Sequence, residues 1–276
     1  MGFINRLANR SLDGRWFLTG SHILLLLVSI VSYHLQRTYT QILFGLACAW
    51  CFEALLYYKT TKYARTSLRD RLFSATAECA GLLILLKTHL WWFYGFASLV
   101  AIGSKYAFRR DHNRHVFNPT NFAITLSVSF LPSHWFAVWA DEYMISWYPM
   151  LHVTCFGVLA VWLARSWLIT VSYFVGLLIA FIPFFAMKTG SDWVYALGPE
   201  VGAAGLIFMF LMVTDPKSSP RQAKYQIVYG CAIAFLQVIL RHQEYLYSRY
   251  ISLFAVTLVS YALQLYRTQL PVVQKG

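Results

Sequence analysis

Ten apolar runs follow one another along almost the entire chain, and they constrain its fold more than any other feature. They lie at about residues 18–35, 41–58, 72–87, 90–108, 119–132, 148–164, 167–187, 197–214, 225–240 and 250–266, with short polar or Pro/Gly breaks between them. About 20 apolar residues cross a bilayer, so ten spans leave only about 7 residues for each loop or terminus. The sequence therefore predicts an all-α polytopic membrane protein, with residues 1–276 as one membrane domain and no separate soluble catalytic domain.

The charge of the chain fits a membrane protein better than a nucleic-acid-binding one. Only 12% of the residues are charged, whereas roughly a quarter are charged in soluble domains. The net charge is +12, and in membrane proteins Lys and Arg collect in cytoplasmic loops. We therefore interpret the charge as an orientation signal, and expect the lipid bilayer rather than nucleic acid as partner.

The distribution of positive residues predicts the topology. If the N-terminus is cytoplasmic, 18 of the 23 lysines and arginines fall on the cytoplasmic side, and the other side receives 5 of them together with Asp141 and Glu142. Such a bias indicates that both termini are cytoplasmic. Residues 1–17 mix arginines with apolar side chains, which favours a helix on the inner membrane surface. No small-residue cleavage site follows the first apolar run, so we expect no removed signal peptide.

Two polar segments interrupt the apolar pattern, at residues 115–122 and 213–220, and they centre on Asn118-Pro119 and Asp215-Pro216. Proline removes a backbone donor and disfavours helix in the preceding residue. One interpretation is ordinary capping, in which Asn118 or Thr120 caps a helix and Asp215-Pro216 ends one. The other is a site shared by the two halves of the chain, 18–132 and 148–267, as in transporters built from inverted repeats. Five spans in each half permit that symmetry.

These two segments, with Ser104-Lys105-Tyr106 ahead of the first, resemble the signature segments of a known family. It contains the D subunit of the Rnf electron-transport complex and the B subunit of the sodium-pumping NADH:quinone reductase. The residues are similar above all to the short stand-alone members found beside enediyne biosynthesis clusters. The resemblance implies two inverted five-helix repeats related to urea channels, and flavin sites within the membrane. It also implies electron transfer linked to quinone or ion movement.

From this resemblance we expect an integral subunit of an electron-transfer system in the bacterial inner membrane, beside other redox or pathway subunits. The expected ligand is a non-covalent flavin (FMN or riboflavin) or a quinone. The polar side chains of the two segments are the expected ligand-binding residues: Asn118, Thr120, Asn121, Thr214, Asp215, Ser218 and Ser219.

One departure from the family argues against covalent FMN. Family members esterify FMN to a threonine in a Ser-Gly-Ala-Thr type motif, which this chain lacks, and residues 133–147 contain no threonine. Two alternatives therefore stay open. One is a transporter or channel that keeps the scaffold without redox chemistry, and the other is a membrane accessory of a biosynthetic pathway.

Other candidates are single residues. Glu78 lies in the middle of the third apolar run, where an ionisable group is costly; it is either part of an ion or proton path or a hydrogen-bonded structural acid. Cys48 and Cys51 have metal-ligand spacing, but cysteine is also an ordinary small apolar residue in membranes, and we expect no metal site. Gly198, Gly202 and Gly205 suit close helix contact or a flat ligand.

Overall fold

The computed structural model describes residues 14–32, 37–60, 67–111, 114–138, 147–189 and 200–269, and this part of the chain is almost entirely helical. Its helices are α2 (Gly14–Ser32), α3 (Tyr39–Thr60), α4 (Leu68–Leu85), α5 (Phe93–Ala107), α6 (Pro119–Phe130), α7 (Trp147–Ala164), α8 (Trp167–Thr189), α10 (Ala203–Ile207), the π-helix η4 (Phe208–Met212), α11 (Ala223–His242) and α12 (Ser248–Gln269), with a 3-10 turn η2 (Ser133–Trp135). Two short antiparallel pairs join β1 (Leu86–Lys87) to β4 (Ala137–Val138) and β2 (Arg109–Asp111) to β3 (Arg114–His115).

Helical structure is present in each of the ten predicted apolar runs. Among the described helices, α3, α7 and α11 are long and apolar enough to cross a membrane on their own. Many apolar side chains point outward, including Leu43, Leu55, Trp162 and Val228, which are 67%, 60%, 64% and 65% exposed. Soluble proteins rarely expose so much apolar surface. The chain is thus a helical membrane protein, while the count of ten spans stays a prediction. The predicted surface helix at 1–17 lies mostly outside the described residues.

Helix α6 covers all but the last two residues of the apolar run at 119–132, and it is too short to cross a membrane on its own. Its 12 residues extend about 18 Å, well short of the roughly 30 Å hydrocarbon core. Asn118 begins it as an N-cap, with its side-chain Oδ1 accepting the Asn121 backbone N–H at 3.0 Å, and Pro119 occupies the first turn. Leu131, which precedes a proline, has an extended backbone and ends it. The capping interpretation of Asn118 is therefore correct.

The eighth apolar run is also broken. Its described part ends one helix at residue 201 and then contains the 5 residues of α10 and the 5 residues of η4, and π-helices are rare and often mark functional sites. A side chain at Gly205 would collide with the backbone carbonyl of Glu200. The small residue at 205 thus lets the chain turn tightly before α10, rather than admitting a neighbouring helix as the glycine pattern predicted.

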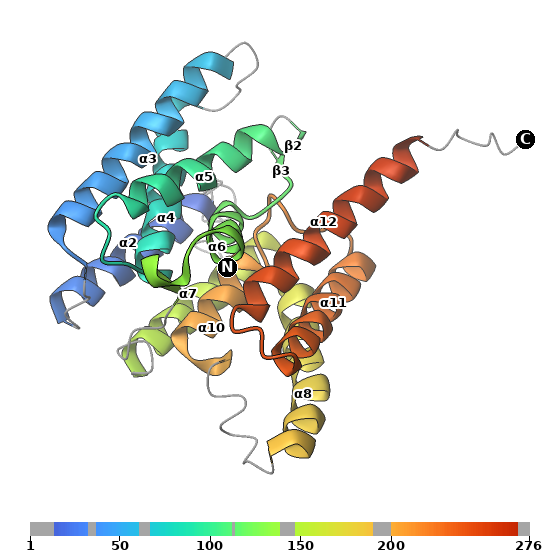
Figure 1. Ribbon diagram of the computed structural model, residues 1–276. Coiled ribbons are helices and arrows are strands. Elements are labelled where there is room, and N and C mark those ends of the chain that lie inside the picture. Colours follow the sequence, from blue (N-terminus) through green and yellow to red (C-terminus); the bar gives the residue numbers. More distant parts are fainter. Residues whose placement is uncertain are drawn as a thin grey trace, which may run out of the picture.

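The first-half helices α3, α4 and α5 lie together on one side of the molecule, and α8, α11 and α12 lie on the other (Figure 1). Within each half the first helix packs on the third, the second on the fourth, and the fourth on the fifth. The halves meet where α2 packs on α7 and where α6 packs on α12. The tightly buried core runs through this junction and includes Tyr94, Tyr173, Phe181 and Phe208.

Candidate functional site

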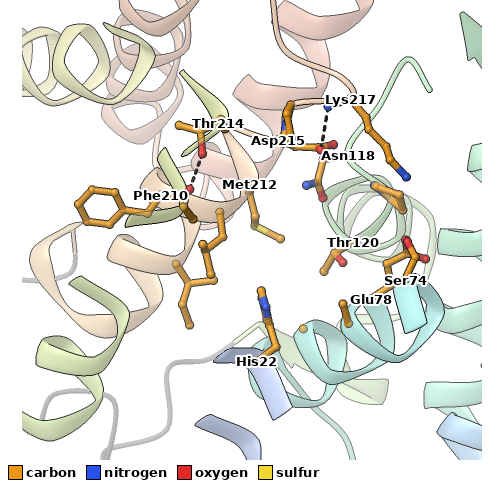
Figure 2. Close-up of a pocket in the computed structure, with 18 of the residues that line it drawn as sticks. His22, Ser74, Glu78, Asn118, Thr120, Phe210, Met212, Thr214, Asp215 and Lys217 are labelled. Carbon is orange, nitrogen blue, oxygen red and sulfur yellow. Dashed lines mark hydrogen bonds between the residues drawn. The ribbon is translucent and has the colours of Figure 1, made fainter. Parts of the chain in front are cut away.

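A cavity of about 450 Å³ lies where the two halves of the chain meet, and both polar segments line it (Figure 2). Asn118, Pro119 and Thr120 contribute from the start of α6, and residues 214–217 contribute from the segment after η4. Helix α4 adds Ser74 and Glu78, and α2 adds His22, whose imidazole points into the cavity from the side opposite Asp215. The apolar part of the wall comes from α7, α10 and η4, and includes Leu163, Phe210 and Met212.

The Asp215 carboxylate organises the second segment. Its Oδ1 accepts the Lys217 backbone N–H at 3.1 Å, and its Oδ2 accepts the Ser218 hydroxyl at 2.9 Å. The His115 Nε2 lies 3.3 Å from the same Oδ2, which joins residues that are 100 positions apart in sequence. Asp215 therefore holds its own turn and also connects it to the first segment.

Arg114 makes a second connection between the segments. Its Nε donates to the Lys217 carbonyl at 3.1 Å and its Nη2 to the Ser219 carbonyl at 2.6 Å. These bonds satisfy backbone carbonyls that the proline-broken turn leaves without helical partners. No sequence pattern indicated this role, because Arg114 is one of many positive charges expected on the cytoplasmic side.

The protonation states of His115 and Asp215 determine whether their contact is an ion pair or a hydrogen bond from a neutral imidazole. Burial, and then the positive charges of Lys217, Lys105 and Arg114, lower the pKa of His115 well below 6.5. Burial also raises the pKa of Asp215 above its usual range, against the opposing effect of its bonds from Lys217 and Ser218. His115 is therefore neutral at pH 7 and donates a hydrogen bond, since Asp215 acts as acceptor toward its other partners.

Not every predicted ligand-binding residue faces the cavity. Asn118, Thr120, Thr214 and Asp215 line it, whereas Asn121, Ser218 and Ser219 do not. Asn121 is buried against α12, where its Nδ2 donates to the Tyr250 carbonyl at 3.2 Å. Ser218 supports Asp215, and Ser219 offers its carbonyl to Arg114. These three residues therefore contact the two segments or α12 without lining the cavity.

Glu78 has a partner that the sequence did not identify. The Lys105 Nζ lies 2.9 Å from the Oε2 of Glu78 and 2.7 Å from the Oε2 of Glu53. The Ser74 hydroxyl donates to the Oε1 of Glu78 at 3.0 Å, and the Tyr106 hydroxyl donates to the Oε1 of Glu53 at 2.5 Å. Lys105 and Tyr106 belong to the segment quoted for the family resemblance, which was the only signal for these two residues.

The remaining candidates do not form a site in the described part of the chain. No group of three or more His, Cys, Asp or Glu side chains there is placed to hold a metal ion. Cys51 is exposed, while Cys79 on the next helix is buried.

Comparison with known proteins adds one match. Residues 127–262, just under half of the chain, match the model of the NQR2, RnfD, RnfE family. No curated protein sequence matches the chain significantly. The match includes the Asp215-Pro216 segment but not the Asn118-Pro119 segment, and it supports the family that both segments resemble. The family and the apolar helices together indicate a multi-pass membrane protein.

Proposed function

We propose that this protein is an integral membrane subunit of an electron-transfer system and that it holds a flavin or a quinone non-covalently in the cavity between its halves. The observation that carries the proposal is the convergence of the two polar segments on one cavity of about 450 Å³. Pockets of about 300–1,000 Å³ are typical for small-molecule ligands and cofactors. The family match adds the electron-transport role, because that family implies a membrane subunit of electron-transport complexes.

The cavity lining suits a flat ring system with polar edges. The Thr120 hydroxyl and the Asn118 amide nitrogen face the cavity without a hydrogen bond to any described residue. Across from them, Phe210, Leu211 and Met212 supply apolar surface. When bound, a flavin or quinone supplies the redox chemistry, while the protein orients and tunes it. In this chain Asn118 and Thr120 bind ring heteroatoms, and Asp215 keeps the second segment in place.

Two inverted five-helix repeats are part of the proposal. The matching packing pattern of the two halves supports them, as does contact between the corresponding helices α2 and α7, and α6 and α12, which is expected beside a pseudo-two-fold axis. The two proline breaks are not equivalent positions of the repeats. Asn118-Pro119 precedes the fifth helix of its half, whereas Asp215-Pro216 follows the third. They therefore meet at the junction without being related by the symmetry.

Orientation and partners extend the same proposal. With both termini cytoplasmic, the cavity opens toward the cytoplasmic side of a bacterial inner membrane, where other redox or pathway subunits bind. Glu78 then lies on the path of a proton or cation between the cavity and the helices of the first half. The stand-alone members beside enediyne clusters remain the proposed nearest relatives, which makes a pathway accessory one form of this function.

The absence of a Ser-Gly-Ala-Thr motif favours a second candidate, a transporter or channel on the same scaffold without redox chemistry. The visible absorption spectrum of the detergent-purified protein separates the two. A bound flavin gives its characteristic spectrum and leaves with the supernatant after acid precipitation, while a quinone appears in an organic extract. A colourless protein without extractable quinone would contradict the proposal and favour the transporter. Flavin fluorescence on the denatured polypeptide would contradict the non-covalent binding.

A matched pair of variants tests the site itself. Thr120→Val removes one hydroxyl from the cavity wall at nearly constant shape, so we expect the protein to lose most of its bound flavin or quinone. Thr154→Val is the control, because the Thr154 hydroxyl only bonds the Met150 carbonyl within α7. Equal ligand content in the two variants would mean that the ligand binds elsewhere.

A further inference from the structure

Two buried charged side chains, Glu53 and Lys105, and the largely buried Glu78 connect helices α3, α4 and α5, and their charges do not cancel. Glu53 is fully buried, Lys105 is 6% exposed, and Glu78 reaches the cavity wall. The two carboxylates share one ammonium group, so the triad carries one excess negative charge when all three groups are ionised. Burying an uncompensated charge is costly. An ion pair that only holds helices together needs one carboxylate for one lysine. The second carboxylate therefore needs another explanation.

The triad is also one part of a continuous chain of donors and acceptors. Tyr106 donates to Glu53 at 2.5 Å, Lys105 lies 2.7 Å from Glu53 and 2.9 Å from Glu78, and Glu78 lines the cavity. At the other end Tyr106 is only partly buried, and Arg109 and Arg71 lie 4.6 Å and 5.8 Å from its ring centre. The chain therefore leads from the predicted cytoplasmic end of α5 to the cavity.

We propose that Tyr106, Glu53, Lys105 and Glu78 form a proton relay between the cytoplasmic face and the cavity. This proposal rests on the proposed function, which provides the reaction that uses the proton. It also specifies that the species passed by Glu78 is a proton. The Lys105 ammonium group occupies the position between the two carboxylates, and this is the position that a bound metal cation would need. The excess negative charge is instead neutralised by one additional proton, shared by Glu53 and Glu78 through Lys105.

Each transfer conserves protons. Glu53 takes a proton from the Tyr106 hydroxyl, which regains one from the solvent. Lys105 passes an Nζ proton to Glu78 and takes the proton of Glu53, so its own charge is unchanged at the end. Glu78 releases the proton into the cavity, whose other lining groups that titrate or carry charge are His22, Arg114, His115, Asp215, Lys217 and Arg221.

Infrared spectroscopy tests the extra proton without any bound ligand. A protonated carboxyl group has a C=O band that shifts in D₂O, and we expect the wild-type protein to gain such a band as the pH is lowered. Glu53→Gln and Glu78→Gln should each remove the triad's share of this band, because either change leaves a balanced pair with Lys105, while the share of Asp215 remains. Glu200→Gln is the control: it removes another buried carboxylate, bonded to Gln237 and Arg249, and should leave the band in place. A band of the same intensity in the wild type and in both triad variants would overturn the relay.

The route is tested by the rate at which the band appears after a rapid drop in pH. Tyr106→Phe removes the entry hydroxyl, and Lys105→Arg keeps the charge but replaces the ammonium with a group that does not deprotonate in proteins. We expect each to slow the rate by about 100-fold or more, the lower end of what a positioned proton-transfer group contributes. If Lys105→Arg fails to fold, Tyr106→Phe still decides, and unchanged rates would refute the route. A protein without flavin or quinone would instead contradict the proposed function and leave these infrared results intact.

Discussion

His115 shows how one neutral side chain makes stability depend on pH. It stays neutral when folded because burial and neighbouring cations lower its pKa well below 6.5. In the unfolded chain it takes up a proton near its ordinary pKa. The unfolded state therefore binds more protons below about pH 6.5, and stability should fall there by at most about 1.4 kcal/mol per pH unit.

The variant His115→Gln removes this titration while keeping a hydrogen-bond donor near Asp215. We expect the difference in melting temperature between about pH 7.5 and about pH 5.5 to be smaller in the variant than in the wild type. Asp215, whose raised pKa acts with the opposite sign, is present in both proteins. An identical pH dependence in both would show that His115 is not held neutral.

Asn118 and Asp215 test the shared site at the residue scale. Asn118→Ala removes the cap of α6, at a cost of about 1 kcal/mol in stability. Asp215→Asn keeps the shape of the turn and removes its charge. If both residues contact one ligand, the two changes should couple by about 0.5–3 kcal/mol in the free energy of ligand binding. Binding effects that add within about 0.5 kcal/mol would leave them as independent helix ends.

At the scale of the elements, helices α8 and α11 form the closest packing of the second half. A side chain at Gly230 of α11 would overlap the Ser172 hydroxyl and lie 2.6 Å from the Ile169 carbonyl of α8. Because that backbone cannot move independently of its helix, Gly230→Ala should destabilise the protein by about 1–3 kcal/mol.

Gly103 in α5 provides the matched control, since nothing lies within 4 Å of a side chain placed there. Gly103→Ala should be neutral or stabilise by up to about 1 kcal/mol, because alanine favours helix. Melting temperatures in detergent compare the two. Similar values for both alanine variants would mean that α8 and α11 do not pack this closely.

The elements also show how far the sequence determines the fold. The apolar runs located the helices, and Asn118-Pro119 and Asp215-Pro216 located the breaks, because proline acts on its immediate neighbours. The run at 119–132 located α6 to within two residues. The partner of Glu78, in contrast, was missed. Its lysine lies 27 positions away on another helix, and no periodicity relates two side chains that meet only in the folded bundle.

For the molecule as a whole, the predicted orientation places one set of helix ends on the cytoplasmic side. Hydrogen bonds connect these ends to one another. Arg109 of β2 bonds Thr60 at the end of α3 at 3.4 Å, and Arg114 of β3 bonds the segment after η4. Gln226 of α11 bonds the Arg165 carbonyl between α7 and α8 at 3.1 Å. Among the described residues, Arg109, Arg114 and Arg165 are thus connected to these ends. This is the distribution expected of a cytoplasmic face.

Single cysteines in a background without the five native ones test the orientation. Gln222 and Ser133 are both exposed and make no side-chain cap bonds, and they lie on opposite predicted sides. An impermeant maleimide added outside intact cells should label Ser133→Cys and leave Gln222→Cys unlabelled until the membrane is opened. Labelling of Gln222→Cys alone would mean that the orientation is the reverse of the predicted one. The Tyr106 end of the relay would then face away from the cytoplasm. Labelling of both before opening would place the two loops on the same side and contradict an odd number of spans between them.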